Sequence, residues 1–406
     1  MFDEGRWVGG LFRPRLPAPV PWLPVSATLQ CTSAGSIRAR SAAPSVSVDS
    51  TMKAKRVGAA LVGAGIIGVL SVGVLLWPRA PMDYTPKELP QIEDAVAFHE
   101  EKVAKSLAAG VPSANTERLV VHRATGSQVV FLYLHGFSAS RGEGEYVLDA
   151  LTAEWSANTW YARLPGHGGP GDALGTALPE QYFDTVTEAV ALANRLGEKV
   201  VVVATSTGAT LALWAAATFP DHIHAVILSS PLIEYADPTA NLLLGSAHAE
   251  RLATLVLGAT RDLRERDASG NPIDLVDHPW TKVYPSKAVV HLEDVRAYAA
   301  RSSVYSAVTQ PTLMFYYFAD EDRQDETISV AAARAAFAQL NRGSAHPQSR
   351  SVAITTGAHV LFSEHVSSDK DTIIQESRQF LREVVGLPPR ERALRQHNSD
   401  GKRPPG

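Results

Sequence analysis

Cysteine is almost absent from this chain: Cys31 stands alone among 406 residues. An intramolecular disulfide is therefore excluded, and no cluster of Cys and His residues has the spacing of a structural zinc site. A basic excess is also lacking, because 38 Lys and Arg residues stand against 42 Asp and Glu residues, for a net charge of -4. We therefore expect no nucleic-acid partner.

Long apolar runs are scarce in the sequence. The run Val57–Trp77 is the one that we expect to cross a membrane. It reads VGAALVGAGIIGVLSVGVLLW and has no charged residue in 21 positions. As a helix it would cover about 31 Å, and a hydrocarbon core is about 30 Å thick. The composition predicts a single transmembrane anchor.

Positive charge before this segment predicts its orientation. Lys53, Lys55 and Arg56 precede it, and most of the chain follows it. The positive-inside rule then places the N-terminus in the cytoplasm and the following domain on the extracytoplasmic side. Secretion after cleavage of a signal peptide is the alternative, but the run is long and lacks an AxA-like cleavage site. An uncleaved anchor is favoured.

The two ends of the chain show no helical or strand periodicity. Residues 1–51 are rich in Pro, Ser, Ala and Gly, and residues 388–406 are polar and rich in Pro and Gly. We interpret the first segment as disordered or as an upstream extension of the reading frame, with Met52 as a candidate start. The second we interpret as a disordered tail.

Residues 90–387 have the pattern of a folded α/β domain. Apolar strand candidates alternate with helical stretches, which predicts a doubly wound, mostly parallel sheet covered on both faces. The strands are expected at residues 118–123, 129–134, 159–162, 200–203, 225–230, 312–318 and 350–354. Helices are expected at residues 92–109, 179–196, 207–218, 326–340 and 371–384.

The segment KVVVVATSTGATLALWAAA, from Lys199 to Ala217, joins a buried strand to a helix with almost nothing between them. Such a tight turn places Ser206 at a corner above the sheet edge, where the following helix points its free N–H groups. This is the geometry of a nucleophile elbow. The usual pattern is GxSxG, and here Ala204 replaces the first glycine, the smallest possible departure.

Further motifs follow other strands. HGFSAS begins at His135 and RLPGHG at Arg163, and ATSTG contains Ser206. In this order and spacing they resemble the α/β-hydrolase fold superfamily, in the branch of monoglyceride lipases, bacterial carboxylesterases and serine aminopeptidase-like hydrolases. The resemblance covers roughly residues 115–385, and its specificity lies in the combination of motifs.

In that superfamily a catalytic triad runs along the chain as serine, acid and histidine. The resemblance thus implies Ser206 as nucleophile, His359 after the last strand as base, and Asp320 as the acid that orients the imidazole. Other acids remain open for the third role: Asp322 and Asp325 in the same loop, and Glu234 and Asp237 after the strand that follows the elbow.

The resemblance also implies an oxyanion hole. Its donors would be the backbone N–H groups of Thr207, directly after the nucleophile, and of Phe137, after His135-Gly136. His135 and His167 in these motifs are interpreted as structural residues that hold their loops. The mechanism needs no metal and no organic cofactor.

An insertion at residues 232–310 separates the strand after the elbow from the acid strand, and we expect it to form a helical cap. It contains a helix candidate, Asn241–Gly258, and the aromatic residues Trp280, Tyr284 and Tyr298. These side chains suit an apolar substrate group, and they equally suit packing of the cap onto the domain.

The leading hypothesis is a membrane-anchored serine hydrolase that cleaves carboxylic esters through an acyl-enzyme. Its expected partner is a small ester or lipid, either a monoacylglycerol or a medium-chain acyl ester. Two alternatives remain: an amidase or aminopeptidase of the same fold, and a non-catalytic binding scaffold. Aspartate-nucleophile chemistry is disfavoured because Ser206 occupies the elbow.

Overall fold

The computed structural model describes residues 73–267, 269–273 and 278–386. The predictions for residues 1–51 and 388–406, and most of the predicted anchor, lie outside these ranges. Among the described residues no helix is long and apolar enough to cross a bilayer. The described residues from Pro78 onward belong to one compact unit; of the other, residues 13–77, only 73–77 are described, with a helical turn at 73–75.

A seven-stranded sheet forms the centre of the domain, in the order β1-β3-β2-β4-β5-β8-β9. All neighbouring strands are parallel except β1 and β3, which run antiparallel at one edge. Uninterrupted β-branched and aromatic runs make the central strands, because both of their faces are buried. The strands are β1 Arg118–Val120, β2 Ser127–Leu134, β3 Asn158–Tyr161, β4 Gly197–Thr205, β5 Ala225–Ser229, β8 Thr312–Tyr317 and β9 Arg350–Ile354.

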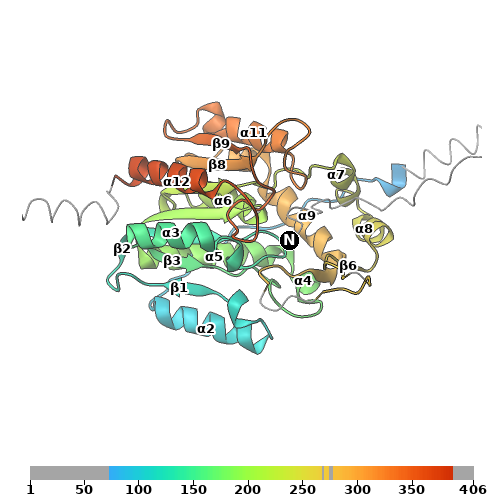
Figure 1. The fold of residues 1–406 in the computed structure, drawn as a ribbon, viewed down its shortest axis with the longest axis horizontal. Helices are drawn as coiled ribbons and strands as arrows, with labels where there is room; N and C mark the ends of the chain where they lie inside the picture. Colours follow the sequence, from blue (N-terminus) through green and yellow to red (C-terminus); the bar gives the residue numbers. More distant parts are fainter. Residues whose placement is uncertain (1–72, 268, 274–277, 387–406) are drawn as a thin grey trace, which may run out of the picture. The chain divides into compact units, whose positions relative to one another are not determined.

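Helices cover both faces of this sheet (Figure 1). α3 (Glu145–Trp155) and α12 (Lys370–Val385) pack on the face to which Phe131 and Tyr133 of β2 point. α5 (Pro179–Leu196) and α6 (Thr207–Thr218) pack on the opposite face, with Leu132 and Leu134. Alternate residues of one strand thus feed two separate cores, as a doubly wound sheet requires.

The five predicted helices are present, at α2 Ala95–Ala108, α5, α6, α11 Val330–Ala338 and α12. α3 was not predicted. Its N-cap is Gly144, which has no side chain to accept an N–H of the first turn, so the start lacks the Ser, Thr, Asp or Asn that commonly marks one. The short elements are α4 Ala173–Thr176, η1 Ser113–Asn115, η2 Arg141–Glu143, η3 Pro220–His222 and η4 Leu340–Gly343.

The insertion between β5 and β8 is largely helical, but the helix expected over Asn241–Gly258 is two helices. α7 ends at Leu244, where the N–H of Gly245 bonds to the Asn241 carbonyl 3.1 Å away, and a turn follows before α8 begins. The elements of the insertion are α7 Pro238–Leu244, α8 Ala249–Leu257, β6 Thr260–Asp262, β7 Val283–Pro285, α9 Lys287–Ala299 and α10 Ser302–Tyr305.

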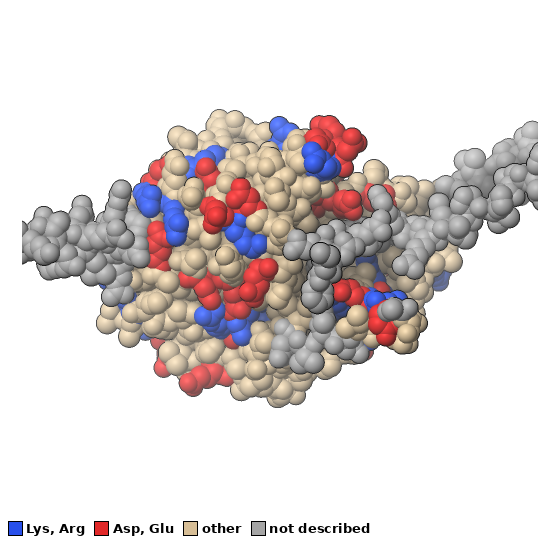
Figure 2. Space-filling view, in the orientation of Figure 1, with Lys and Arg blue, Asp and Glu red and all other residues tan. Residues whose placement is uncertain are grey.

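Charges of both signs are interspersed over the face of the molecule shown in Figure 2. No broad positive patch is seen on the described part of this face. The surface in view thus agrees with the nearly balanced numbers of positive and negative residues in the sequence.

Candidate active site

Ser206 lies at the corner between β4 and α6, in a backbone conformation that L-residues rarely adopt, with φ 55° and ψ -116°. Its N–H donates to the carbonyl of Ser229, 2.9 Å away, which holds the corner against the neighbouring strand. Gly208 is needed here because a Cβ at that position would lie 2.1 Å from the Leu134 carbonyl oxygen. Ala204 pairs within the sheet without difficulty, so the departure from GxSxG does not disturb the elbow.

The structure brings Ser206 and His359 together, although 153 positions separate them in the sequence. The Nε2 atom of His359 lies 2.9 Å from Ser206 Oγ. On the other side of the ring, Nδ1 lies 2.8 Å from Oδ2 of Asp325. Three side chains from three loops at the carboxyl edge of the sheet thus form one chain of hydrogen bonds.

The assignment of Asp320 as the acid is wrong, and Asp325, which the sequence left open, holds that position. The side chain of Asp320 is 45% exposed, and its carboxylate binds the guanidinium of Arg323 at 2.6 Å and 2.8 Å. The chain makes an excursion after β8, closed by a bridge between Phe318 and Gln324. Residues 319–323 form the turn outside this bridge. Asp325 follows it, next to the end of β8, where its N–H donates to the Tyr317 carbonyl at 3.1 Å.

The other acids considered from the sequence lie elsewhere. Asp322 and Glu234 are exposed. Asp237 caps α7, where its carboxylate accepts the N–H of Thr239 at 2.8 Å. Of the acids considered for this role, Asp325 is the one that reaches the imidazole.

The carboxylate of Asp325 is fixed at both oxygens. Oδ1 accepts the backbone N–H groups of Thr327 and Ile328 at 2.9 Å and 3.1 Å, and Oδ2 faces His359. The side chain is 0% exposed, whereas that of His359 is 11% exposed. A buried acceptor of this kind selects the tautomer of His359 that carries hydrogen on Nδ1, which leaves Nε2 free to accept a proton from Ser206.

Opposing influences set the pKa of His359. Burial works to lower it, but the charge of Asp325, the hydrogen bond to Asp325 and the charge of Glu143 together raise the pKa above its ordinary value. The ring is therefore a stronger base than a solvent-exposed histidine. This suits a group that takes up a proton while a hydroxyl attacks.

Phe137 and Thr207 occupy positions compatible with an oxyanion hole. Thr207 is the first residue of α6, and Phe137 follows Gly136 in the loop after β2. A Cβ on Gly136 would lie 3.2 Å from Ser206 Cβ, so this loop passes directly beside the nucleophile. No acceptor for either N–H occurs among the residues that the structure describes.

His135 and His167 hold these loops, in line with the interpretation from the sequence. His135 is fully buried; its Nδ1 lies 2.9 Å from the Gly136 carbonyl, and its Nε2 accepts the N–H of Leu164 at 3.0 Å. Burial lowers the pKa of His135 to about 4, so the ring is neutral at pH 7. His167 Nδ1 lies 2.9 Å from the Pro165 carbonyl, which pins the PGHG turn.

The aromatic residues of the insertion are packed against the domain. Trp280, Tyr284 and Tyr298 are all buried. The rings of Tyr284 and Phe137 pack edge to face, with their centroids 5.5 Å apart. The hydroxyl of Tyr298 donates to the Tyr84 carbonyl at 2.7 Å. The insertion therefore reaches the loop that carries the predicted oxyanion donor.

Glu143 is a residue of this neighbourhood that sequence reasoning missed. It is 1% exposed, and burial raises the pKa of its carboxyl to about 7. The signal available in the sequence was an acid between two glycines, Gly142 and Gly144, shortly after HGFSAS.

Within the described ranges, no group of three or more His, Cys, Asp and Glu residues could hold a metal ion.

Residues 129–367 match the sequence model of the Alpha/beta hydrolase family, which is more than half of the chain. The chain belongs to this family. The match runs from β2 past His359 and so includes the elbow, the insertion and both loops that meet Ser206.

A solved structure shows the same fold. It comes from a study of the metagenome-derived lipolytic enzymes LipS and LipT, is 18% identical and aligns with a TM-score of 0.52 over 66% of this chain and 98% of its own. The monoacylglycerol lipase of Paleococcus ferrophilus is 17% identical, with a TM-score of 0.47 over 66% of this chain and 98% of its own. Among curated protein sequences no match was found.

Proposed function

We propose that the protein is a membrane-anchored serine hydrolase that cleaves carboxylic esters through an acyl-enzyme. The observation that carries the proposal is the continuous chain of hydrogen bonds from Ser206 through His359 to Asp325. A serine hydroxyl is too weak an acid to attack unaided, and this arrangement gives it a base whose own pKa is raised.

The chemistry follows from the geometry. Ser206 Oγ attacks the ester carbonyl carbon while its proton passes to Nε2 of His359, and Asp325 stabilises the imidazolium that forms. The imidazolium then gives the proton to the departing alkoxide, which leaves as an alcohol. Water, deprotonated by the same imidazole, releases the acid from Ser206. Negative charge on the carbonyl oxygen would be held by the N–H groups of Phe137 and Thr207.

An apolar acyl group is the substrate part that the surroundings suit best. Apolar side chains lie near the site: Phe137 is beside the elbow, and Val360, which follows His359, packs with Trp280. The similar fold from the LipS and LipT study belongs to lipolytic enzymes. We infer a medium-chain acyl ester or a monoacylglycerol as the substrate class.

Anchoring is proposed from the apolar run Val57–Trp77. The chain that follows it is tied to the insertion: Pro78 forms a β-bridge with Ser246, and the N–H of Arg79 donates to the Gly245 carbonyl at 2.8 Å. The guanidinium of Arg79 also binds Asp294 of α9 at 2.7 Å. The positive residues before this run support a location of the folded domain on the extracytoplasmic side.

The test is activity of the full chain in detergent, with a fluorophosphonate probe and with p-nitrophenyl esters of increasing acyl length. Ser206→Ala is expected to abolish labelling and to lower kcat by at least about a thousandfold. Ser377→Ala, which removes a fully buried hydroxyl from α12, serves as the control and should behave as wild type. Wild-type protein that is folded yet neither labelled nor active would contradict the proposal.

A further inference from the structure

Glu143 is a buried carboxylate at which three separate parts of the molecule meet. Its Oε2 accepts the backbone N–H of Gly136 at 2.7 Å and the hydroxyl of Tyr133 at 3.2 Å. Its Oε1 accepts the indole N–H of Trp280 at 3.4 Å. These donors belong to the loop after β2, to β2 itself and to the insertion. The carboxylate therefore joins β2 and the loop after it to the insertion, whose Trp280 is 137 positions away in the sequence.

One of these contacts lies directly behind the candidate nucleophile. A Cβ on Gly136 would be 2.9 Å from Oε1 of Glu143 and 3.2 Å from Cβ of Ser206. Gly136 thus lies close to both side chains, with no room for a side chain of its own. The hydrogen bond to Glu143 holds the His135–Gly136 peptide. The next peptide, Gly136–Phe137, carries the N–H that is predicted to bind the oxyanion, so Glu143 can position it only through Gly136.

The Tyr133 contact leads to the elbow itself. Its hydroxyl lies 3.2 Å from Oγ1 of Thr205, the residue immediately before Ser206. Gly144 makes room for this ring, because a Cβ there would be 2.2 Å from the Tyr133 ring carbon Cζ. Glu143 is therefore linked, through one tyrosine, to the strand end that carries the nucleophile.

The Trp280 contact links Glu143 to the insertion and, through the packing of Trp280, to the loop that carries His359. Trp280 packs in a small apolar cluster with Ala139 of the oxyanion loop and with Val360 and Val366 of the histidine loop. The neighbouring N–H of Thr281 donates to the Ser138 carbonyl at 2.6 Å. A shift of Trp280 would thus be felt in both loops beside Ser206.

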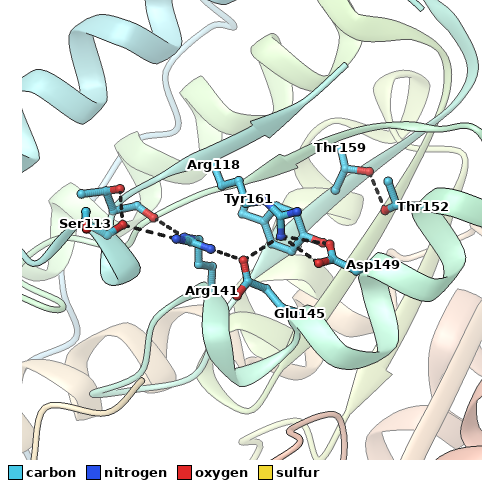
Figure 3. A network of polar contacts seen from close by, with 9 residues as sticks. Ser113, Arg118, Arg141, Glu145, Asp149, Thr152, Thr159 and Tyr161 are labelled. Atoms are coloured by element: carbon cyan, nitrogen blue, oxygen red, sulfur yellow. Dashed lines mark hydrogen bonds and ion pairs between the residues drawn. The ribbon is translucent and has the colours of Figure 1, made fainter. Parts of the chain in front are cut away.

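The segment that carries Glu143 is held from its outer side by an ionic network (Figure 3). Arg141 of η2 binds Glu145 and the Ser113 carbonyl, and Arg118 of β1 binds Glu145 at 2.8 Å and Asp149 at 2.9 Å. Arg141 and Glu145, which flank Glu143 in the sequence, are both held by this network. The side chain of Glu143 is buried on the inner side, so its carboxylate has little freedom to move.

We propose that Glu143 is a positioning residue of the hydrolytic reaction, which holds Gly136 in place, thereby positions the N–H of Phe137, and couples this loop to the insertion through Trp280. It touches neither Ser206 nor His359 by a hydrogen bond, so it acts through the oxyanion loop. This inference rests on the proposed esterase function. It implies that loss of the carboxylate weakens transition-state binding more than substrate binding.

The experiment compares Glu143→Gln with Glu117→Gln in the full chain, with p-nitrophenyl butyrate as substrate. The glutamine side chain has the length of the native one but can place only one acceptor oxygen among the three donors. We expect kcat to fall about tenfold to a hundredfold while KM changes by less than about threefold. Inhibition by an alkyl boronic acid, which mimics the tetrahedral intermediate, should weaken by a similar factor.

Glu117 is the matched control because it is also a buried carboxylate, bonded to Ser106 Oγ at 2.7 Å and to Arg163 at 3.2 Å. Its replacement should lower the Tm without a change in kcat. If Glu143→Gln lowers the Tm but leaves kcat and boronic acid affinity at the level of Glu117→Gln, Glu143 is only a structural residue and the inference is overturned.

A second variant covers the case in which Glu143→Gln does not fold. Trp280→Phe removes the indole N–H and keeps an aromatic ring in the cluster, and it should lower kcat about threefold to tenfold with little change in KM. An unchanged kcat in that variant overturns the inference. If wild type itself neither hydrolyses the ester nor reacts with the fluorophosphonate, the proposed function falls, and this inference falls with it.

Discussion

The two halves of the loop after β8 present the same residue type in opposite environments. In the outer half, the side chain of Asp320 is 45% exposed and pairs with Arg323, three residues away. In the inner half, Asp325 is 0% exposed and pairs with His359, 34 residues away. The two aspartates lie close together in the sequence, and the return of the chain to the sheet decides which of them meets the imidazole.

The difference shows what distinguishes the aspartate that can serve His359: its side chain is buried, and backbone N–H groups bind the carboxylate oxygen that does not face the ring. Water screens the Asp320–Arg323 pair, so that pair contributes little to structure. Asp325 is removed from water, and two backbone N–H groups on one oxygen keep the other oxygen aimed at the ring. In a low-dielectric site such a charge acts strongly on a neighbouring group.

The sharpest way to test this comparison is to neutralise each aspartate in turn. Asp325→Asn should lower kcat by about a thousandfold to ten-thousandfold, because an amide can stabilise the wrong tautomer of His359 and cannot stabilise its charged form. Asp320→Asn should leave kcat within about twofold of wild type, since its carboxylate faces solvent. The measurement is steady-state ester hydrolysis with active-site titration by the fluorophosphonate probe. A large loss in Asp320→Asn with none in Asp325→Asn would reverse the assignment.

A smaller effect is expected in the pH profile of kcat/KM. His359 must be neutral to accept the serine proton, so activity should fall about tenfold per pH unit below its pKa. That pKa is raised by the charge and hydrogen bond of Asp325 against the opposing effect of burial, and it is raised further by the charge of Glu143. The acidic limb of wild type should therefore lie above the ordinary histidine value.

Removal of Asp325 removes two of the influences that raise this pKa. The acidic limb of the residual activity in Asp325→Asn should accordingly move to lower pH, while that of Asp320→Asn should coincide with wild type. An acidic limb that stays in place in Asp325→Asn would show that His359 does not govern it. The profile is measured from about pH 4 to about pH 9, with a substrate whose own ionisation lies outside this range.

The smallest effect concerns stability. Asp325→Ala should lower the free energy of unfolding by about 1–3 kcal/mol, because the N–H groups of Thr327 and Ile328 lose their acceptor in a buried place. Asp320→Ala should leave the denaturation midpoint unchanged within error. Urea denaturation followed by circular dichroism measures both. Equal loss in the two variants would mean that the inner half of the loop is no better supported than the outer half.

Much of the site could be predicted because it depends on short sequence patterns. The apolar run that ends at Ala204 and the alanine-rich helix after it place Ser206 at the corner, and the position of His359 after the last strand follows from strand order. Asp325 could not be singled out, since five acids lie in the loop and the turn closed by the bridge between Phe318 and Gln324 is a tertiary feature.

Three other features also escaped prediction. α3 begins at a glycine without a capping side chain, and the helix expected over Asn241–Gly258 breaks after Leu244. Glu143 resembles any acid in a glycine-rich loop until Tyr133 and Trp280 close over it. Trp280 lies 137 positions from Glu143, so the sequence around Glu143 does not reveal this contact.

The sequence by itself determined the alternating α/β pattern, the strained serine corner and the order of serine, acid and histidine along the chain. The first two depend on local propensity and on the periodicity of apolar residues, which act within a few positions. The order of the three residues is what the resemblance to the α/β-hydrolase fold superfamily implies. Only the tertiary structure decided which aspartate serves His359 and where Glu143 lies. A carboxylate acquires such a role through burial and converging donors, and both arise when distant segments pack together.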